Sequence, residues 1–317
     1  MSTKIATREA YGKALLELGR INPAVVALDA DLSGSTKTKV FAKEFPDRFF
    51  NMGIAEQDMV GTAAGLALTG KIPFASTFAV FATGRAWEQI RQSVCYPELN
   101  VKVAASHAGI TVGEDGGSHQ SVEDIALMRV LPNMTVIVPA DGVETTKAVM
   151  AMGKHVGPTY IRVGRSKVET IYDDSYDFRI GKASVISSGI DCSIIACGIM
   201  VQMALKAASE LDAEGLSVGV INMATIKPLD TDAVLTAARE SGAIVTAEEH
   251  SIIGGLGAAV AETLAEGCPV PMKRVGVKDV FGSSGKPDEL LRHYGLTSDD
   301  IKAAVREVVA RKAKVAV

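Results

Sequence analysis

The sequence predicts an α/β protein of two domains, each built on a mainly parallel sheet flanked by helices. Three observations support this fold class. Short runs rich in Val and Ile alternate with Ala-rich stretches of helical period, which is the pattern of βαβ units. A polar, aperiodic segment interrupts the alternation near the middle. The chain has 317 residues and 47% hydrophobic content, enough for a buried core in each of two domains.

The first domain is expected to span residues 1–165. Five strand-like runs occur in it, at residues 24–30 (AVVALDA), 72–77 (IPFAST), 101–106 (VKVAAS), 135–140 (TVIVPA) and 159–163 (TYIRV). A linker follows over residues 166–183.

The second domain is expected over residues 184–317 and is smaller. Its strand-like runs lie at 193–198 (SIIACG), 216–223 (LSVGVINM), 242–249 (GAIVTAEE) and 272–277 (MKRVGV). Helical stretches are expected around 200–213, 230–241, 255–266 and 298–313. Polar residues and glycines gather after strands in both domains, where ligands bind in open α/β sheets.

Charge and hydropathy exclude several classes of function. The 33 basic and 37 acidic residues give a net charge of −4, so no electrostatic attraction to nucleic acid or to a membrane surface is expected. No run of 18 uncharged apolar residues occurs, and the first residues lack the apolar core of a secretory signal. We therefore expect a cytoplasmic protein. The cysteines show no metal-site spacing and are expected to be buried, reduced thiols: Cys95, Cys192, Cys197 and Cys268.

Residues 48–70 (RFFNMGIAEQDMVGTAAGLALTG) predict an extended piece followed by a Gly/Ala-rich helix, with Glu56 near the start of that helix. Glu56 either complements the helix dipole or is a semi-buried acid that receives a heterocycle.

Phe78 and Phe81 are three residues apart and could share one face. They are either core residues or a surface on which a ring stacks.

Residues 106–132 (SHAGITVGEDGGSHQSVEDIALMRVLP) hold four glycines between two histidines, which predicts a mobile or tightly turned loop. His107, Asp115 and His119 could decorate this loop, hold a polar substrate or bind a metal. Ser121 followed by Asp124 resembles a capping box, so a helix is expected to start there.

Other polar groups carry weaker signals. Arg8, Arg162 and Arg165 lie at the edges of expected elements, where arginines are usually solvated or paired. Asp141 stands three residues before Glu144, a helix-capping pattern. The GGLG of residues 254–257 opens a helix, so its amides either receive an anion or pack tightly against a strand.

In order along the chain, the segments IATREAYGKAL, GIAEQ, GEDGGSHQ, PADG and EEHSIIGGLG resemble those of the transketolase family. The resemblance implies a pyrimidine-type domain that binds thiamine diphosphate, followed by the smaller transketolase C-terminal domain. It places Glu56 on the glutamate that activates the cofactor by a hydrogen bond to its aminopyrimidine ring. It also carries Phe78 and Phe81 onto the aromatic wall of the pyrimidine site, and Asp31 onto a cofactor-site aspartate.

The same resemblance implies substrate contacts. Positions that hold a sugar phosphate in transketolases match Arg8, Ser35, His107 and Arg165. Asp115 and His119 match groups that contact sugar hydroxyls or assist proton transfer at the reacting carbon, so His107, His119 and Glu56 are the expected catalytic residues. Arginine suits phosphate because its planar fork binds oxygens in pairs. No protein ligand to a metal is expected in this chain.

The sequence departs from single-chain transketolases in three places. Gln57 follows the glutamate where many members have histidine, and Gly84 stands where some have a third aromatic residue. No GDG segment with a later asparagine, the family's diphosphate and magnesium signature, is found. The resemblance therefore implies that Mg²⁺ (or Ca²⁺) and the diphosphate are bound mainly by an N-terminal partner subunit, in an α2β2 heterotetramer.

The expected function is transfer of a two-carbon ketol unit from a ketose phosphate to an aldose phosphate. Within the family, the alternatives are the C-terminal half of a deoxyxylulose-phosphate synthase and the beta subunit of a 2-oxoacid dehydrogenase. A noncatalytic scaffold or regulatory subunit is an alternative of another class, and a metal-dependent hydrolase using His107, Asp115 and His119 is a third.

Overall fold

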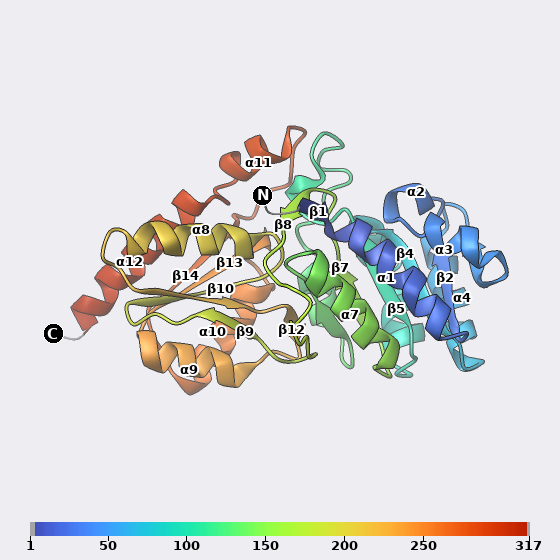
Figure 1. Cartoon of the computed structure of the whole chain (residues 1–317), viewed down its shortest axis with the longest axis horizontal. Helices are drawn as coiled ribbons and strands as arrows, with labels where there is room; N and C mark the ends of the chain where they lie inside the picture. Colours follow the sequence, from blue (N-terminus) through green and yellow to red (C-terminus); the bar gives the residue numbers. More distant parts are fainter. Residues whose placement is uncertain (1–3, 316–317) are drawn as a thin grey trace.

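The computed structural model describes residues 4–315, and within them the strands form three sheets. A seven-stranded and a five-stranded sheet, both mainly parallel and flanked by helices, lie in the two halves of the molecule (Figure 1). The predicted fold class is therefore confirmed. None of the helices in the described range is long and apolar enough to cross a membrane.

The first sheet has the order β12-β6-β7-β5-β4-β2-β3. All neighbouring strands are parallel except β12 and β6. Each of the five strand-like runs expected in this region contains one strand, and the carboxyl ends of these strands meet at one edge. The bounds are β2 (Val25–Asp29), β3 (Phe49–Asn51), β4 (Ile72–Phe78), β5 (Lys102–Ser106), β6 (Thr135–Ile137), β7 (Thr159–Arg162) and β12 (Thr225–Lys227).

Helices cover this sheet on both faces, and the longest of them, α1, α4 and α7, bury apolar residues. Figure 1 shows α1 and α7 side by side on one face. They approach closely at Gly153, where an added Cβ would lie 2.6 Å from the Leu18 side chain. The helices are α1 (Thr7–Ile21), α2 (Ser33–Thr36), α3 (Lys39–Glu44), α4 (Glu56–Leu68), α5 (Trp87–Gln89), α6 (Asp124–Arg129) and α7 (Gly142–Lys154). Tighter 3-10 turns occur at Pro46–Arg48 and Ile110–Val112, and wider π-helical turns at Phe81–Arg85 and Ile90–Cys95.

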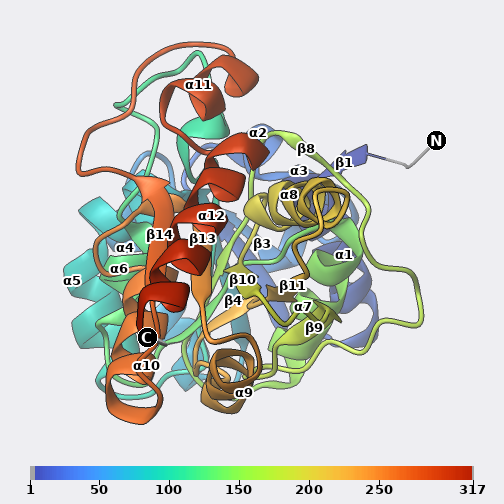
Figure 2. The same cartoon turned by 90° about the vertical axis from the view of Figure 1, so that its left-hand side faces the viewer.

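The second sheet has the order β14-β13-β10-β11-β9, in which only β9 runs antiparallel to its neighbour among the described strands. Figures 1 and 2 show α8 and α12 on one face and α9 and α10 on the other. The strands are β9 (Ser184–Ser187), β10 (Cys192–Ala196), β11 (Val218–Asn222), β13 (Ile244–Ser251) and β14 (Met272–Val277). The helices are α8 (Met200–Asp212), α9 (Thr231–Ser241), α10 (Leu256–Gly267), α11 (Pro287–His293) and α12 (Ser298–Val315).

The two sheets are joined by shared structure. β1 (Lys4–Ala6) pairs with β8 (Lys167–Glu169) as an antiparallel ribbon, and β12 leaves the second half to pair with β6 of the first sheet. One hydrophobic cluster runs from Val138 of the first half to Ile221 of the second. The cysteines are free thiols, as predicted, with Cys95, Cys192 and Cys197 buried and Cys268 partly exposed.

Candidate active site

A stack of aromatic rings lies at the carboxyl edge of the first sheet. Phe78 ends β4, and Phe81 begins the π-helical turn that follows. Their rings are stacked with centroids 5.8 Å apart, and the His107 ring stacks on Phe78 at 3.9 Å. His119 meets both phenylalanines edge-on, at 6.2 and 5.6 Å. The two candidate aromatic residues and the two candidate histidines therefore form one cluster.

A buried histidine links this cluster to a cation. His107 follows β5 in a left-handed conformation (φ +56°), and its Nε2 lies 3.3 Å from Arg8 Nη1. Its Nδ1 lies 2.8 Å from Ser106 Oγ. Because an arginine can only donate, Nε2 accepts and Nδ1 carries the proton. Arg8 also donates to the main-chain oxygen of Ser35, at 2.9 Å. Burial, followed by the charges of Arg8 and Arg165, lowers the pKa of His107 to about 3.

Glu56 is connected to the aromatic rings through Arg85. It is the first residue of α4 and is only 4% exposed, so water does not solvate its carboxylate freely. Among the described residues, that carboxylate takes one hydrogen bond, from Arg85 Nη1 at 3.3 Å. The Arg85 guanidinium lies 4.2 Å from the Phe81 ring centroid. Sequence inspection missed Arg85, although its position four residues after Phe81 was a usable local signal.

The glycine-rich loop brings a second group of candidates together. Arg165 donates to the main-chain oxygen of Val112 and lies 3.6 Å from Asp115 Oδ2 and 3.5 Å from Glu114 Oε2. Asp115 is exposed, whereas His119 is half-buried and pairs with the Ser118 hydroxyl at 3.0 Å. Arg165 thus places its positive charge beside the loop, whereas Arg8 places its positive charge beside the aromatic cluster.

Asp31 stands apart from these contacts. It follows β2 in a left-handed conformation (φ +62°), is exposed and exchanges hydrogen bonds with Asn51 at 3.2 Å. Within residues 4–315 no group of three or more His, Cys, Asp and Glu side chains is arranged to hold a metal ion. In that range, therefore, neither Asp31 nor another acid completes a metal site with His107 and His119.

Arg162, which had no assigned role, is a buried link between the halves of the molecule. Its Nε donates to Asp124 Oδ2 at 2.8 Å, and its Nη2 donates to the main-chain oxygen of Glu249 at 2.9 Å. Burial alone would raise the pKa of Asp124, but Arg162 beside it keeps that pKa below its usual range.

The capping-box interpretation of Ser121 and Asp124 was wrong. α6 does start at Asp124, but Ser121 makes no side-chain cap because Asp124 is held by Arg162 and Tyr160.

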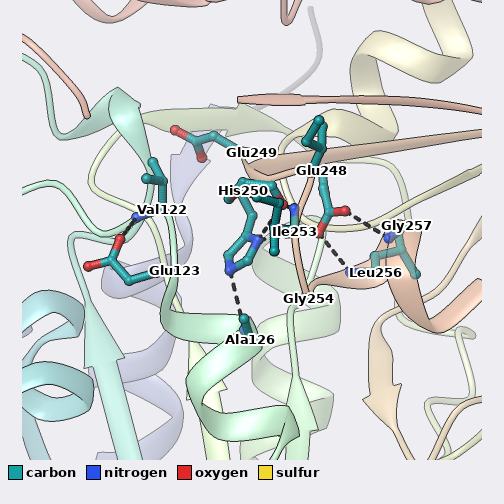
Figure 3. A network of polar contacts seen from close by, with 12 residues as sticks. Val122, Glu123, Ala126, Glu248, Glu249, His250, Ile253, Gly254, Leu256 and Gly257 are labelled. Carbon is teal, nitrogen blue, oxygen red and sulfur yellow. Dashed lines mark hydrogen bonds and ion pairs between the residues drawn. The ribbon is translucent and has the colours of Figure 1, made fainter. Parts of the chain in front are cut away.

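The backbone amides of the GGLG segment bind a side-chain carboxylate of the same chain, that of Glu248. Glu248, near the end of β13, accepts from the amides of Leu256 and Gly257 at 2.7 Å each (Figure 3). A Cβ on Gly255 would overlap the same carboxylate. Both interpretations of this segment therefore hold in part: the helix amides do receive an anion, and the glycine permits close packing of strand against helix.

Comparisons with known proteins agree with this architecture. Residues 3–170 match the family model of the transketolase pyrimidine-binding domain, and residues 181–301 match that of the transketolase C-terminal domain. The chain is 51% identical over 308 residues to a protein named as a putative transketolase C-terminal section from Methanocaldococcus jannaschii, with 96% of each covered. It is 46% identical to a 6-deoxy-6-sulfo-D-fructose transketolase subunit from a Clostridium species, with 96% of this chain and 95% of that protein covered.

A solved structure described as a split gene transketolase, inactive beta4 tetramer, is 57% identical and superposes with a TM-score of 0.92. The match covers 97% of this chain and 99% of that one. The order of the two domains, the sequence identity and the superposition all agree. The chain therefore belongs to the transketolase family and corresponds to the C-terminal section of a split transketolase.

Proposed function

We propose that this chain supplies the pyrimidine-binding side of a thiamine-diphosphate-dependent transketolase site and acts with an N-terminal partner subunit. The reaction is transfer of a two-carbon ketol unit from a ketose phosphate to an aldose phosphate. One observation carries the proposal. A continuous line of contacts runs from Arg8 through His107, Phe78, Phe81 and Arg85 to Glu56.

The Glu56 end of this line fits an aminopyrimidine. A flat heterocycle needs an aromatic surface, which Phe78 and Phe81 provide, and its ring nitrogen needs an acid shielded from water, which Glu56 provides. Glu56 has acceptor capacity beyond its single bond from Arg85. When bound, thiamine diphosphate supplies the carbon nucleophile and the electron sink that let a bond beside a ketone break and re-form.

The Arg8 end fits a sugar phosphate. Arg8 and Arg165 offer guanidinium groups for phosphate oxygens, and neutral His107 offers a polar edge to a hydroxyl or carbonyl group. His119, edge-on to both phenylalanines, lies between the two ends and is our choice for moving a proton at the substrate hydroxyl. Asp115 would contact a second hydroxyl, and Ser35 would contribute to the phosphate site. Asp31 would lie at the rim of the cofactor site.

The remaining parts of the site belong to the proposed partner. This chain has no GDG signature, so Mg²⁺ (or Ca²⁺) and the diphosphate would be held mainly by the N-terminal subunit. The relatives that match over almost their full length are a C-terminal section and a subunit, which supports a two-chain enzyme, proposed here as an α2β2 heterotetramer in the cytoplasm. The domain limits we propose are 1–165 and 184–317, with a linker between them.

A reconstitution experiment tests the function. The chain is mixed with a candidate partner carrying the GDG signature, magnesium and thiamine diphosphate, and ketose phosphates are screened as donors together with 6-deoxy-6-sulfo-D-fructose. We expect a stable complex and ketol transfer to an aldose phosphate. Pyruvate is included as a donor, because release of CO2 from it with transfer to an aldehyde would instead indicate a synthase. Failure of every pairing to form a complex or transfer a ketol unit would contradict the proposal.

Replacing Glu56 by Gln tests the cofactor side in the same assay. The amide of a glutamine cannot give and take a proton as a carboxyl group does, so turnover should fall by about two or more orders of magnitude while the complex still forms. Asp58→Asn is the matched control, because Asp58 lies in the same first turn of α4 but is exposed. Near-normal turnover of Glu56→Gln would refute its assigned role.

A further inference from the structure

The loop that carries Asp115 and His119 turns through several left-handed backbone positions, most of them taken by glycine. We call residues 107–121 the substrate loop. His107, Gly109, Gly113 and Gly116 all have positive φ, between +56° and +87°. Its own main-chain bonds run from Gly109 to Ser121, from Gly113 to Ile110, from Gly116 to Gly113, and from His119 and Gln120 to Gly116. Contacts with its surroundings add to these bonds in holding the loop in one conformation.

The second half of the molecule supplies such surroundings. We call residues 281–287 the buttress. They belong to the segment between β14 and α11 and end at Pro287, the first residue of α11. A Cβ on Gly117 would lie 2.6 Å from the Gly282 oxygen, and one on Gly116 would overlap Ser284 Oγ. The two backbones therefore lie against each other, and in Figures 1 and 2 the teal substrate loop rises beside α11 at the top of the molecule.

Gln120 joins the loop to the buttress. Its side chain is 4% exposed, and its Nε2 donates to Ser283 O at 3.0 Å and to Ile110 O at 3.0 Å, with Gly113 O at 3.4 Å. One amide group thus holds both ends of the 3-10 turn of the loop and the main chain of the buttress. The fit is close, because a Cβ on Gly282 would overlap Gln120 Oε1.

The buttress is itself fixed to the second half. The Tyr294 hydroxyl, directly after α11, lies 3.0 Å from Phe281 O and 3.0 Å from Ser283 Oγ. It can donate to the carbonyl while accepting from the serine. Tyr294 thereby fixes Phe281 and Ser283, and the Ser283 carbonyl accepts from Gln120.

We infer that Gln120 is a positioning residue through which the C-terminal domain sets the geometry of Asp115 and His119 at the substrate site. The side-chain bonds of Gln120 go to the loop and the buttress, so it acts through the loop and not on the substrate. Its effect should be larger on the sugar than on the cofactor, because the loop itself carries Asp115 and His119. Glu56, Phe78 and Phe81 lie on other elements, and the two phenylalanines contact the loop through the His107 and His119 rings. The inference rests on the proposed function only for what the loop binds.

Gln120→Met in the full chain tests this inference, since it keeps the shape of the side chain and removes its donors. Tyr294→Phe is a second variant, which acts from the buttress side. The matched control is Gln202→Met, because Gln202 also joins two segments, accepting from the Glu169 amide at 3.0 Å, and that bond involves neither the loop nor the buttress. Amide hydrogen exchange of residues 107–121 should be faster by about tenfold or more in both test variants and unchanged in the control.

The complex with the partner subunit provides the second measurement. KM for the sugar phosphate should rise, or kcat fall, by about tenfold in Gln120→Met, while the Kd for thiamine diphosphate stays within about twofold of wild type. Unchanged exchange of the loop overturns the inference. So does faster exchange with wild-type sugar kinetics, or an equal loss of cofactor affinity. If the wild-type complex transfers no ketol unit, the proposed function fails, and the exchange experiment still decides whether Gln120 holds the loop.

Discussion

At the scale of single residues, His107 shows how surroundings decide what an imidazole can do. Its ring lies on Phe78, its Nε2 faces Arg8 and its Nδ1 faces Ser106. A proton added to Nε2 would face the Arg8 guanidinium in a buried place, so the neutral form is favoured. His107 therefore serves as an acceptor and a neutral donor, and in the proposed site it would not bind a phosphate as a cation.

The state of His107 can be measured. Its pKa is lowered to about 3, so its imidazole NMR signals should not titrate between about pH 5 and 8, whereas in the urea-unfolded chain they should titrate near pH 6.5. Because the folded pKa is the lower one, its contribution to the free energy of unfolding is complete above about pH 6.5. That contribution is lost as the pH falls toward the folded pKa. Titration of His107 near pH 6.5 in the folded chain would contradict this assignment.

At the scale of elements, the start of α10 shows a helix capped from the strand that precedes it. Glu248 of β13 occupies two of the amides that a helix N-terminus leaves unpaired. His250 on the same strand accepts from the Ala126 amide at 3.3 Å and lies 2.7 Å from Ser251 O, so it joins α6 to the second sheet (Figure 3). The strand thus fixes one helix of each half.

Removing this cap should be costly. Glu248→Ala leaves the Leu256 and Gly257 amides buried without partners, so the free energy of unfolding should fall by about 1–3 kcal/mol. The control is Glu262→Ala on the same helix, whose exposed pair with Arg129 should contribute less than about 1 kcal/mol. Urea unfolding of both variants measures the difference. Equal effects would mean that Glu248 does not cap α10.

At the scale of the whole molecule, Glu144 ties three parts of the chain together. It lies in the first turn of α7, where Asp141 caps the Glu144 amide at 2.8 Å as predicted. Its carboxylate accepts from Tyr176 at 2.6 Å and from Asn222 of β11 at 2.9 Å. Burial raises the pKa of Glu144 to about 7, although these hydrogen bonds oppose the rise. The junction between the halves therefore depends on an acid that is protonated more easily than usual.

This acid should make the stability of the protein depend on pH. The pKa of Glu144 in the folded chain is above the ordinary value of about 4.5. Its contribution to the free energy of unfolding is therefore complete below about pH 4.5 and is lost as the pH rises through about 7. Glu144→Gln should remove this part of the slope when the free energy of unfolding is measured in urea at pH 5, 6 and 7.5. Glu240→Gln, at an exposed position of α9, controls for the loss of one charge. A slope unchanged by Glu144→Gln would contradict the role given to burial.

The sequence by itself determined the fold class, five strands of the first sheet, four strands of the second and the start of α7. These features depend on hydrophobic period and on capping groups within a few residues of each other, which are visible in a short window. It also placed the polar residues after the strands, because carboxyl ends of parallel strands meet at one edge. The resemblance supplied the roles of Glu56, Phe78 and Phe81.

Only the tertiary structure decided the contacts between distant segments. Gln120 and Ser283 are 163 residues apart in the sequence, and Arg162 and Glu249 are 87 residues apart. No local sequence pattern predicts either contact. The pairing of β12 with β6 is of the same kind. Ser121 shows the reason most directly. Its local pattern favoured a cap, but Asp124 gains more from a buried arginine and a tyrosine hydroxyl, and those partners are set by how the two halves pack.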